Sequence, residues 1–325
     1  RLLPEDDVVL AGTGPLLYLY VMQLKKFGIR PQAILDTGPP LSLRTSLLGL
    51  RALITCPQAM FQGMRWLWGA GVKTNMTRGV DSLKAQGGDH LSSVSYEARG
   101  RRHELSTSLL LVHDGVIPNT WLSMSAGIKH HFNETQNCWV PGIQGAGLTS
   151  RDCISIVGDA AGIGGAEVAM LQGERVAREV DAYLEDHQHP QTSIESGVLR
   201  RQRWMRSFID EAFPSTAQFQ SPENDIVVCR GEEVTAGEIR QVTERGCMGP
   251  NQGKAFTRCG MGPCMGRKCG LTVSRLMAQV RGVSVQEVGH YRIRSPIRPI
   301  TVGQLADMES ILKGDNQSVL SANSS

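Results

Sequence analysis

The sequence has no strong excess of charge, no long unbroken hydrophobic run and no segment typical of an export signal. Its 325 residues carry a net charge of only +3 at pH 7, which is too small to favour a nucleic-acid partner. The most apolar stretch, residues 8–24, is interrupted by Gly12-Thr13-Gly14-Pro15, so we expect a strand, a turn and a helix there rather than a membrane span. These absences predict a soluble, cytoplasmic chain.

The cysteines lack the spacings that indicate disulfide chemistry. No two of the eight cysteines form a Cys-x-x-Cys pair, which argues against a redox disulfide beside a flavin. Their uneven spacing favours reduced thiols and cofactor ligation over a disulfide framework. With 41% hydrophobic and 20% charged residues, the chain is expected to form two or three globular domains.

One glycine-rich loop concentrates the cysteines. Residues 257–270 read TRCGMGPCMGRKCG, and five of the eight cysteines fall between positions 229 and 269. Thiolates on such a loop suit an iron–sulfur cluster or zinc, whereas the alternative is a set of reduced, partly buried thiols. The candidate ligands are Cys229, Cys247, Cys259, Cys264 and Cys269, and the cations expected to offset their charge are Arg258, Arg267 and Lys268.

The N-terminal segment has the outline of a βαβ dinucleotide-binding unit. A strand, a helix and a second strand ending in Asp36 are expected over residues 7–36. In such units glycines equivalent to Gly12 and Gly14 let a pyrophosphate approach the helix, and the acid accepts a hydrogen bond from a ribose. Leu17 replaces the third glycine and should push the helix off the strand. An altered site and a working one both stay open, and NAD(P) is not expected.

The next stretch supplies a third strand and a group of large side chains. A strand is expected at residues 108–112, and His113 and Asp114 after it are assigned no catalytic role. The large side chains lie on a helix-like stretch and are expected in the core: Met60, Met64, Trp66 and Trp68.

A second glycine constellation predicts a flavin site. A strand over residues 153–157 and a helix over 167–184 are expected to flank it. Glycines at a helix N-terminus with an acid at the strand end suit FAD, because the helix end favours the pyrophosphate and the carboxylate can accept from a ribityl hydroxyl. The predicted cofactor contacts are Gly158, Asp159, Gly162, Ile163, Gly164 and Gly165, besides Gly12 and Gly14. The N-terminal unit of about a hundred residues that holds the ADP half of FAD in such proteins is expected outside this sequence or on another polypeptide.

Composition shifts divide the chain into four predicted segments. A polar linker with prolines at residues 213–225 places a boundary near residue 222, and a polar loop is expected at 187–196. A capping box at Thr235 and Glu238 opens a helix beyond that boundary. The segments are 1–122, a pyridine-nucleotide-like βαβ domain; 123–222, the C-terminal part of an FAD-binding domain with a connector; 223–313, a cysteine-rich domain; and 314–325, a disordered tail.

Together these motifs resemble the alpha (A) subunits of heteromeric flavin amine dehydrogenases. This family includes the A subunit of opine oxidase, the B subunit of hydrogen cyanide synthase, and alpha subunits of dye-linked proline and hydroxyproline dehydrogenases. The matching stretches are residues 9–17, 113–119, 158–165 and 258–270. The resemblance implies an α/β, two-dinucleotide-binding-domain flavoprotein fold, similar to disulfide reductases. It also implies a small helical C-terminal domain similar to bacterioferritin-associated ferredoxin, which binds a [2Fe–2S] cluster.

The resemblance also implies which cysteines hold that cluster. The family uses Cys-x-Cys in a strand-turn and Cys-x-x-x-x-Cys in the loop, and Cys229, Cys264 and Cys269 match. The fourth position is Gly231. Because a [2Fe–2S] cluster takes two ligands on each iron, Cys259 or Cys247 would have to replace the missing thiolate, or the cluster is absent.

Three functions follow from these features. The first is an electron-transfer subunit of a heteromeric amine, opine or amino-acid dehydrogenase. It would receive electrons from the flavin of a beta subunit and pass them through FAD, and through a [2Fe–2S] cluster where one is present, to an acceptor. Amine oxidation is then expected in the partner chain, since no residue here is a convincing general base. The alternatives are an NAD(P)H-dependent flavin reductase and a non-catalytic assembly subunit whose cysteine domain binds zinc or nothing.

Overall fold

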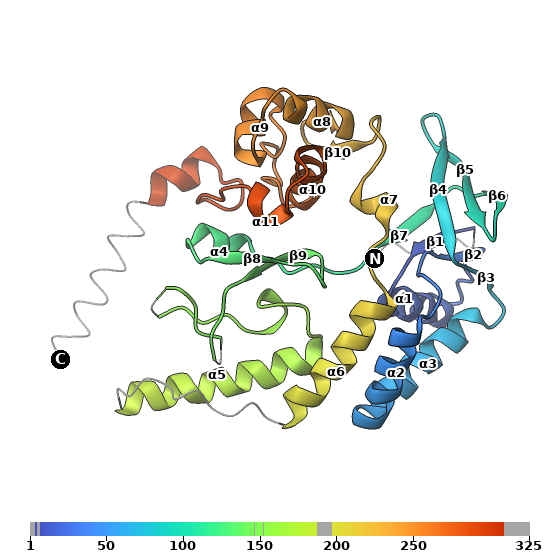
Figure 1. The fold of residues 1–325 in the computed structure, drawn as a ribbon, viewed down its shortest axis with the longest axis horizontal. Coiled ribbons are helices and arrows are strands. Elements are labelled where there is room, and N and C mark those ends of the chain that lie inside the picture. The colour runs from blue at the N-terminus through green and yellow to red at the C-terminus, as the bar shows by residue number, and fades with distance from the viewer. Residues whose placement is uncertain (1–3, 5–6, 146, 152, 187–196, 309–325) are drawn as a thin grey trace. The chain divides into compact units, whose positions relative to one another are not determined.

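The computed structural model describes residues 4, 7–145, 147–151, 153–186 and 197–308, which form two compact units (Figure 1). The first unit comprises the chain up to Thr120 together with Gly127–Glu223, and the second comprises Trp121–Ala126 together with the chain from Asn224. The loop predicted at 187–196 and the tail predicted at 314–325 lie outside the described residues.

A four-stranded parallel sheet forms the centre of the first unit. Its strand order is β3-β2-β1-β7, and Val9 of β1 pairs with Ala33 on one side and Leu110 on the other. The helix α1 (Pro15–Lys26) connects β1 to β2 and begins with a proline, whose missing N–H costs nothing in a first helical turn. The predicted βαβ unit is therefore present. The strands are β1 (Val9–Gly12), β2 (Ala33–Asp36), β3 (Asn75–Arg78) and β7 (Leu110–His113).

Alternate residues of the sheet supply two hydrophobic cores. Leu10 and Ile34 pack on the α1 side with Leu17, whereas Val9 and Leu35 pack on the opposite side. The second core is completed by an antiparallel sheet of order β4-β5-β6. Because both faces of the two central strands β1 and β2 are covered, these strands are buried throughout and mainly apolar, whereas the edge strand β3 is polar. The antiparallel strands are β4 (Val80–Gly87), β5 (Leu91–Ala98) and β6 (Arg101–Ser106).

Two helices, α2 (Leu43–Thr55) and α3 (Pro57–Gly71), lie between β2 and β3 in the chain. Ser42 caps α2, and Lys25 of α1 donates hydrogen bonds to carbonyls at the C-terminus of α3, which suits the negative end of that helix. The prediction that the large side chains here belong to the core is wrong for Met64 and Trp68, which are exposed. The helix packs through one stripe only, and these two residues lie outside it.

The rest of the first unit is a hairpin, a glycine turn and further helices. The strand predicted at residues 153–157 is absent from the described structure, where only Ser155 forms a bridge, to Leu148. An apolar run becomes a strand only when a neighbouring strand pairs with it. The elements are β8 (His130–Asn133), β9 (Cys138–Pro141), the 3₁₀ turn η1 (Gly158–Ala160), α5 (Ala166–Asp186), α6 (Gly197–Ala212) and α7 (Ala217–Gln220).

The second unit is small and mainly helical. Its core includes Ile239 from α8 and Leu276 and Met277 from α10, all of them buried. The predicted capping box is confirmed, because Thr235 N–H donates to Glu238 Oε2 at 2.8 Å and Glu238 N–H donates to Thr235 Oγ1 at 3.2 Å. The elements are α4 (Trp121–Ser125), β10 (Val227–Cys229), β11 (Val234–Thr235), α8 (Ala236–Glu244), α9 (Pro250–Thr257), α10 (Gly270–Arg281) and α11 (Val285–Val288). In neither unit does a described helix have the length and apolar character needed to cross a membrane.

Candidate functional site

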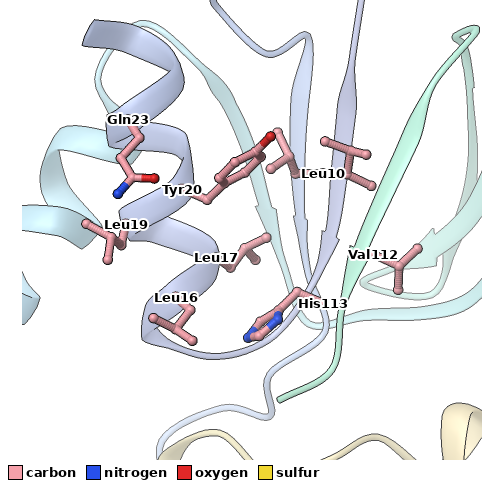
Figure 2. A pocket seen from close by; sticks show the side chains of 9 residues that line it. Leu10, Leu16, Leu17, Leu19, Tyr20, Gln23, Val112 and His113 are labelled. Atoms are coloured by element: carbon pink, nitrogen blue, oxygen red, sulfur yellow. The ribbon is translucent and has the colours of Figure 1, made fainter. Parts of the chain in front are cut away.

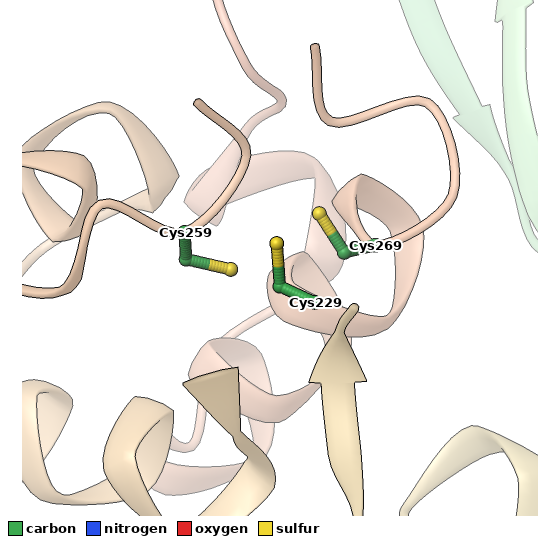
Figure 3. A group of neighbouring side chains, drawn as sticks. All are labelled: Cys229, Cys259 and Cys269. Carbon is green, nitrogen blue, oxygen red and sulfur yellow. The ribbon is translucent and has the colours of Figure 1, made fainter. Parts of the chain in front are cut away.

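Three cysteines from separate elements converge in the second unit. Cys229 ends β10, Cys259 follows α9, and Cys269 is the residue that precedes α10. Their sulfur atoms all lie within 4.8 Å of one another and point toward a common centre (Figure 3). Each residue is only 1–2% exposed. We call Cys229, Cys259 and Cys269 the thiol trio.

The surroundings of the thiol trio favour negatively charged sulfur. The Gly260 amide donates to Cys229 Sγ at 3.4 Å, and Cys269 lies at the N-terminus of α10, where the helix dipole is positive. A hydrogen bond from Cys269 is the main reason that the pKa of Cys259 is lowered to about 7. The same bond raises the pKa of Cys269, and its burial adds to that shift. The hydrogen bonds within the thiol trio therefore favour a thiolate on Cys259 over one on Cys269.

Tyr291 fixes the shape of the cysteine loop. Its side chain is buried, and its hydroxyl donates to the Cys259 carbonyl at 3.0 Å. A Cβ placed on Gly260 or Gly266 would lie 2.7 Å from the Tyr291 ring, and one on Gly270 would lie 3.1 Å from it. Glycines are therefore required here for close contact with the ring. Nothing in the local sequence signals this role, because Tyr291 lies well beyond the loop.

Lys254, which was not among the predicted cations, interacts electrostatically with two members of the thiol trio. Arg258 pairs with Glu232 at 2.9 Å, and Arg267 donates to the Ile297 carbonyl at 2.7 Å. Lys254 instead lies with its ammonium 4.5 Å from the centre of the Tyr291 ring. Burial and the charge of Arg294 lower the pKa of Lys254 overall, and Cys269 and Cys259 oppose that shift. Position 254 is one helical turn before the cysteine loop. This spacing could have identified Lys254 from the sequence, but the prediction considered only cations within the loop.

The other predicted ligands lie outside the thiol trio. Cys264 is half-buried and is not within 4.8 Å of all three sulfurs, and Cys247 donates its thiol to the Gly249 carbonyl at 3.6 Å. At Gly231 an added Cβ would meet Gly262 Cα at 3.3 Å. The thiol trio can hold a metal ion or a cluster, and it offers three thiolates where a [2Fe–2S] cluster takes four.

The predicted flavin turn forms the N-terminal approach to α5. Asp159 Oδ1 accepts hydrogen bonds from the Gly164 and Gly165 amides, both at 3.0 Å. Ile163 is buried, and its amide donates to Gln136 Oε1 at 3.2 Å, which anchors the turn. No atom lies within 4 Å of a Cβ added to Gly165, whose φ of 94° favours glycine. An open helix N-terminus beside a carboxylate fits a pyrophosphate-containing cofactor.

In the first glycine motif, neighbouring residues of the protein fill the space around the glycines and bond the acid. A Cβ on Gly12 would lie 1.7 Å from the His113 carbonyl oxygen, so β7 requires this glycine, and a Cβ on Gly14 would lie 3.6 Å from the His113 ring. Asp36 is 5% exposed and accepts a hydrogen bond from the Tyr18 hydroxyl at 2.6 Å. The predicted ribose acceptor is thus engaged internally. Leu17, at the position of the third glycine, is buried in the core.

An apolar cavity of about 420 Å³ lies beside this motif, between α1 and the strands β1 and β7 (Figure 2). Burial lowers the pKa of His113, and Asp114 opposes that shift. None of the described residues that line the cavity is a lysine or an arginine, which makes it a poor site for a pyrophosphate. The lining residues are Leu10, Leu16, Leu17, Leu19, Tyr20, Gln23, Leu111, Val112 and His113.

Tyr18→Phe is expected to destabilise the first unit by about 2 kcal/mol, because a buried carboxylate loses a charge-assisted hydrogen bond. Arg78 Nε, 3.7 Å from Asp36 Oδ2, would be left as a weaker partner. Urea unfolding should show a lower midpoint at unchanged slope. Tyr20→Phe, on the same helix but partly exposed, is the matched control, and an equal loss in both variants would contradict the assignment.

The chain is similar in sequence to A subunits of opine oxidases and to a subunit of hydrogen cyanide synthase. It is 36% identical to the A subunit of opine oxidase from Rhizobium meliloti (strain 1021), with 94% of this chain and 68% of that protein covered. It is 35% identical to the A subunit of opine oxidase from Agrobacterium tumefaciens (strain Ach5), with 94% and 62% covered. It is 29% identical to hydrogen cyanide synthase subunit HcnB of Pseudomonas protegens, with 91% and 65% covered. The chain thus spans roughly 60–70% of these relatives' length.

Two further comparisons concern the second unit and the fold. The sarcosine oxidase A3 domain family matches residues 224–308, which include the thiol trio. The structure is similar to L-proline dehydrogenase from P. horikoshii, with a TM-score of 0.59 and 17% identity, over 92% of this chain and 50% of that one. At such low identity the likeness concerns the fold alone. It confirms the predicted α/β flavoprotein fold class with its parallel sheet.

Proposed function

Since the chain belongs to the family of the opine oxidase A subunits, we propose that it is the electron-transfer flavoprotein subunit of a heteromeric amine, opine or amino-acid dehydrogenase. The observation that carries the proposal is the open glycine turn at the N-terminus of α5, with Asp159 beside it. FAD, when bound, accepts and releases electrons singly or in pairs.

Each part of the turn has a task in holding the flavin nucleotide. The dipole at the N-terminus of α5 favours the negatively charged pyrophosphate, and Asp159 shapes this approach by accepting from the Gly164 and Gly165 amides. Asp159 is exposed, so its second carboxylate oxygen can accept from a ribityl hydroxyl. Gln136, bonded to both the amide and the carbonyl of Ile163, keeps the turn in place during exchange of electrons.

Reduction by a pyridine nucleotide has little support. A working site would present Asp36 to a ribose, but this carboxylate is buried against Tyr18 and also accepts from the Gly38 amide at 2.9 Å. We therefore assign electron entry to a companion subunit that oxidises the amine, and not to NAD(P)H.

An apolar surface on α2 and α3 supports a companion subunit. Leu43, Leu47, Leu50 and Ile54 recur at helical spacing on α2 and are each 57–79% exposed. On α3, Phe61, Met64 and Trp68 follow the same spacing and are exposed as well. We call these seven residues the α2–α3 apolar surface. Exposed apolar stripes of this kind mark interaction sites, and aromatic and methionine side chains are enriched in them.

The charge around the α2–α3 apolar surface restricts its partner. Residues 37–73 contain no aspartate or glutamate, and their charged residues are Arg65, Lys73, Arg44, which pairs with Glu211 of α6 at 3.5 Å, and Arg51, which lies over the Trp204 ring. Such a rim is complementary to an acidic one, because opposite charges at the border of an interface speed and orient association. The expected occupant is an apolar patch of the companion subunit bordered by carboxylates.

The absorption spectrum of the purified complex tests the proposed function. We expect a flavin spectrum that an amine or opine substrate bleaches only when the companion subunit is present. NADPH alone should leave it unchanged. Rapid bleaching by NADPH without the companion would favour the flavin reductase instead, and a colourless complex would contradict both.

A further inference from the structure

We propose that Cys229, Cys259 and Cys269 bind a single zinc-class ion, and that this centre holds the second unit together and carries no electrons. The inference concerns the second unit alone and stands whether or not the first unit binds flavin.

The spacing of the sulfurs favours one ion. Zinc binds thiolates at about 2.3 Å in tetrahedral geometry, so thiolates that share an ion lie roughly 3.8 Å apart. All three sulfur pairs here are within 4.8 Å, and a small inward movement of each side chain reaches that value. In a [2Fe–2S] cluster the ligands are divided between two irons, which places ligands of different irons further apart than ligands of one ion. The thiol trio contains no such division.

The positions of the other family ligands do not fit a two-iron cluster. At residue 231 the backbone runs against the loop, since Gly262 Cα would be 3.3 Å from a Cβ there. A side chain at residue 231 would therefore require the neighbouring backbone to move by a few tenths of an ångström, and the glycine itself supplies no sulfur. Cys264, which the family pattern would use, lies outside the thiol trio, and Cys259, which that pattern does not use, lies inside it.

The charge of the centre is matched by its surroundings. Three thiolates and one divalent ion carry a net charge of −1, after the thiols have released their protons to solvent. The Gly260 amide, the N-terminus of α10 and the Lys254 ammonium supply compensating positive charge. With three protein ligands, a water molecule takes the fourth position of the tetrahedron.

An ion at this place would join three separate elements of the second unit. Cys229, Cys259 and Cys269 belong to β10, the loop after α9 and the start of α10. Binding therefore stabilises the folded unit directly, as in other small zinc domains. Zinc has no accessible second oxidation state, so electrons leaving the proposed flavin would not pass through this unit.

Single substitutions distinguish the two ligand sets. In the full chain, purified under reducing conditions and loaded with Zn²⁺, we expect about one ion per chain. Cys259→Ser should weaken zinc binding by on the order of 100-fold or more, because a direct ligand is lost. Cys264→Ser, in the same loop, should retain the ion. The family ligand set demands the reverse, so loss in Cys264→Ser with retention in Cys259→Ser would overturn the proposal.

A measurement on the unaltered chain keeps the test independent of variant folding. Co²⁺ loaded in place of zinc should give the visible bands of a tetrahedral site and near-ultraviolet thiolate charge-transfer bands, and Zn²⁺ should displace them. Anaerobic reconstitution with iron and sulfide should leave no stable cluster. Two irons with acid-labile sulfide per chain, or an absence of cobalt–thiolate bands, would refute the single-ion centre.

Discussion

Asp159→Ala should strip most of the FAD from the complex formed with the companion subunit. The substitution removes a carboxylate that bonds two amides of the turn and is proposed to accept from the flavin ribityl chain. The loss of a charged hydrogen-bond partner costs about 2 kcal/mol, which corresponds to a roughly 30-fold weaker affinity. Flavin released by dilution and measured by fluorescence gives the affinity directly.

The matched control is Asp181→Ala, which removes an exposed carboxylate from α5, the helix that follows the turn, well away from the turn itself. It should retain its FAD. A second variant, Gly165→Val, fills the open space in front of α5 and should also lose the cofactor. If Asp159→Ala and Gly165→Val both bind FAD as tightly as Asp181→Ala, the flavin does not bind at this turn, and the observation on which the proposed electron-transfer role rests is refuted.

The double substitution Leu47→Asp with Leu50→Asp should prevent assembly with the companion subunit. Each leucine is exposed in the isolated chain, so folding should be unaffected to within about 0.5 kcal/mol. Burial of each leucine at an interface is worth roughly 1.5–3 kcal/mol, and a buried unpaired carboxylate adds a penalty. Co-purification and analytical ultracentrifugation should therefore show affinity reduced by more than about 100-fold.

Ser46→Asp adds one negative charge to the same helix at an exposed position beside the apolar stripe, and should assemble normally. The two variants also separate the possible occupants of the α2–α3 apolar surface. If the double variant still assembles but no longer binds anionic lipid vesicles that the unaltered chain binds, the surface contacts a bilayer and our assignment to a companion subunit is wrong.

Local sequence rules were sufficient for much of the fold. The βαβ unit follows from short apolar runs around a glycine–proline turn, and the capping box at Thr235 and Glu238 depends on residues three apart. Such signals hold because each depends on neighbours along the chain. The strand expected at residues 153–157 does not form, because a strand also requires a pairing partner elsewhere in the chain, which local sequence does not reveal.

Local sequence patterns could not predict which cysteines form the thiol trio. Cys259 and Cys264 are indistinguishable by spacing, since each lies five residues from a neighbouring cysteine. Which one turns inward is decided by the left-handed conformation of Arg258, with φ of 59°, and by Tyr291, which bonds the Cys259 carbonyl. Trp68 was likewise expected in the core, because an apolar helix face that meets a partner has the same spacing as one that meets the interior.

The contact of Tyr291 with three loop glycines also sets the order of events during synthesis. Tyr291 is synthesised after all three cysteines of the thiol trio. A nascent chain that ends before residue 291 therefore has the three thiols but lacks the aromatic ring against which the loop packs. We therefore expect the proposed ion to bind only after Tyr291 has emerged from the ribosome. A chain stalled upstream would present reactive, unshielded sulfur to oxidants and to competing metals.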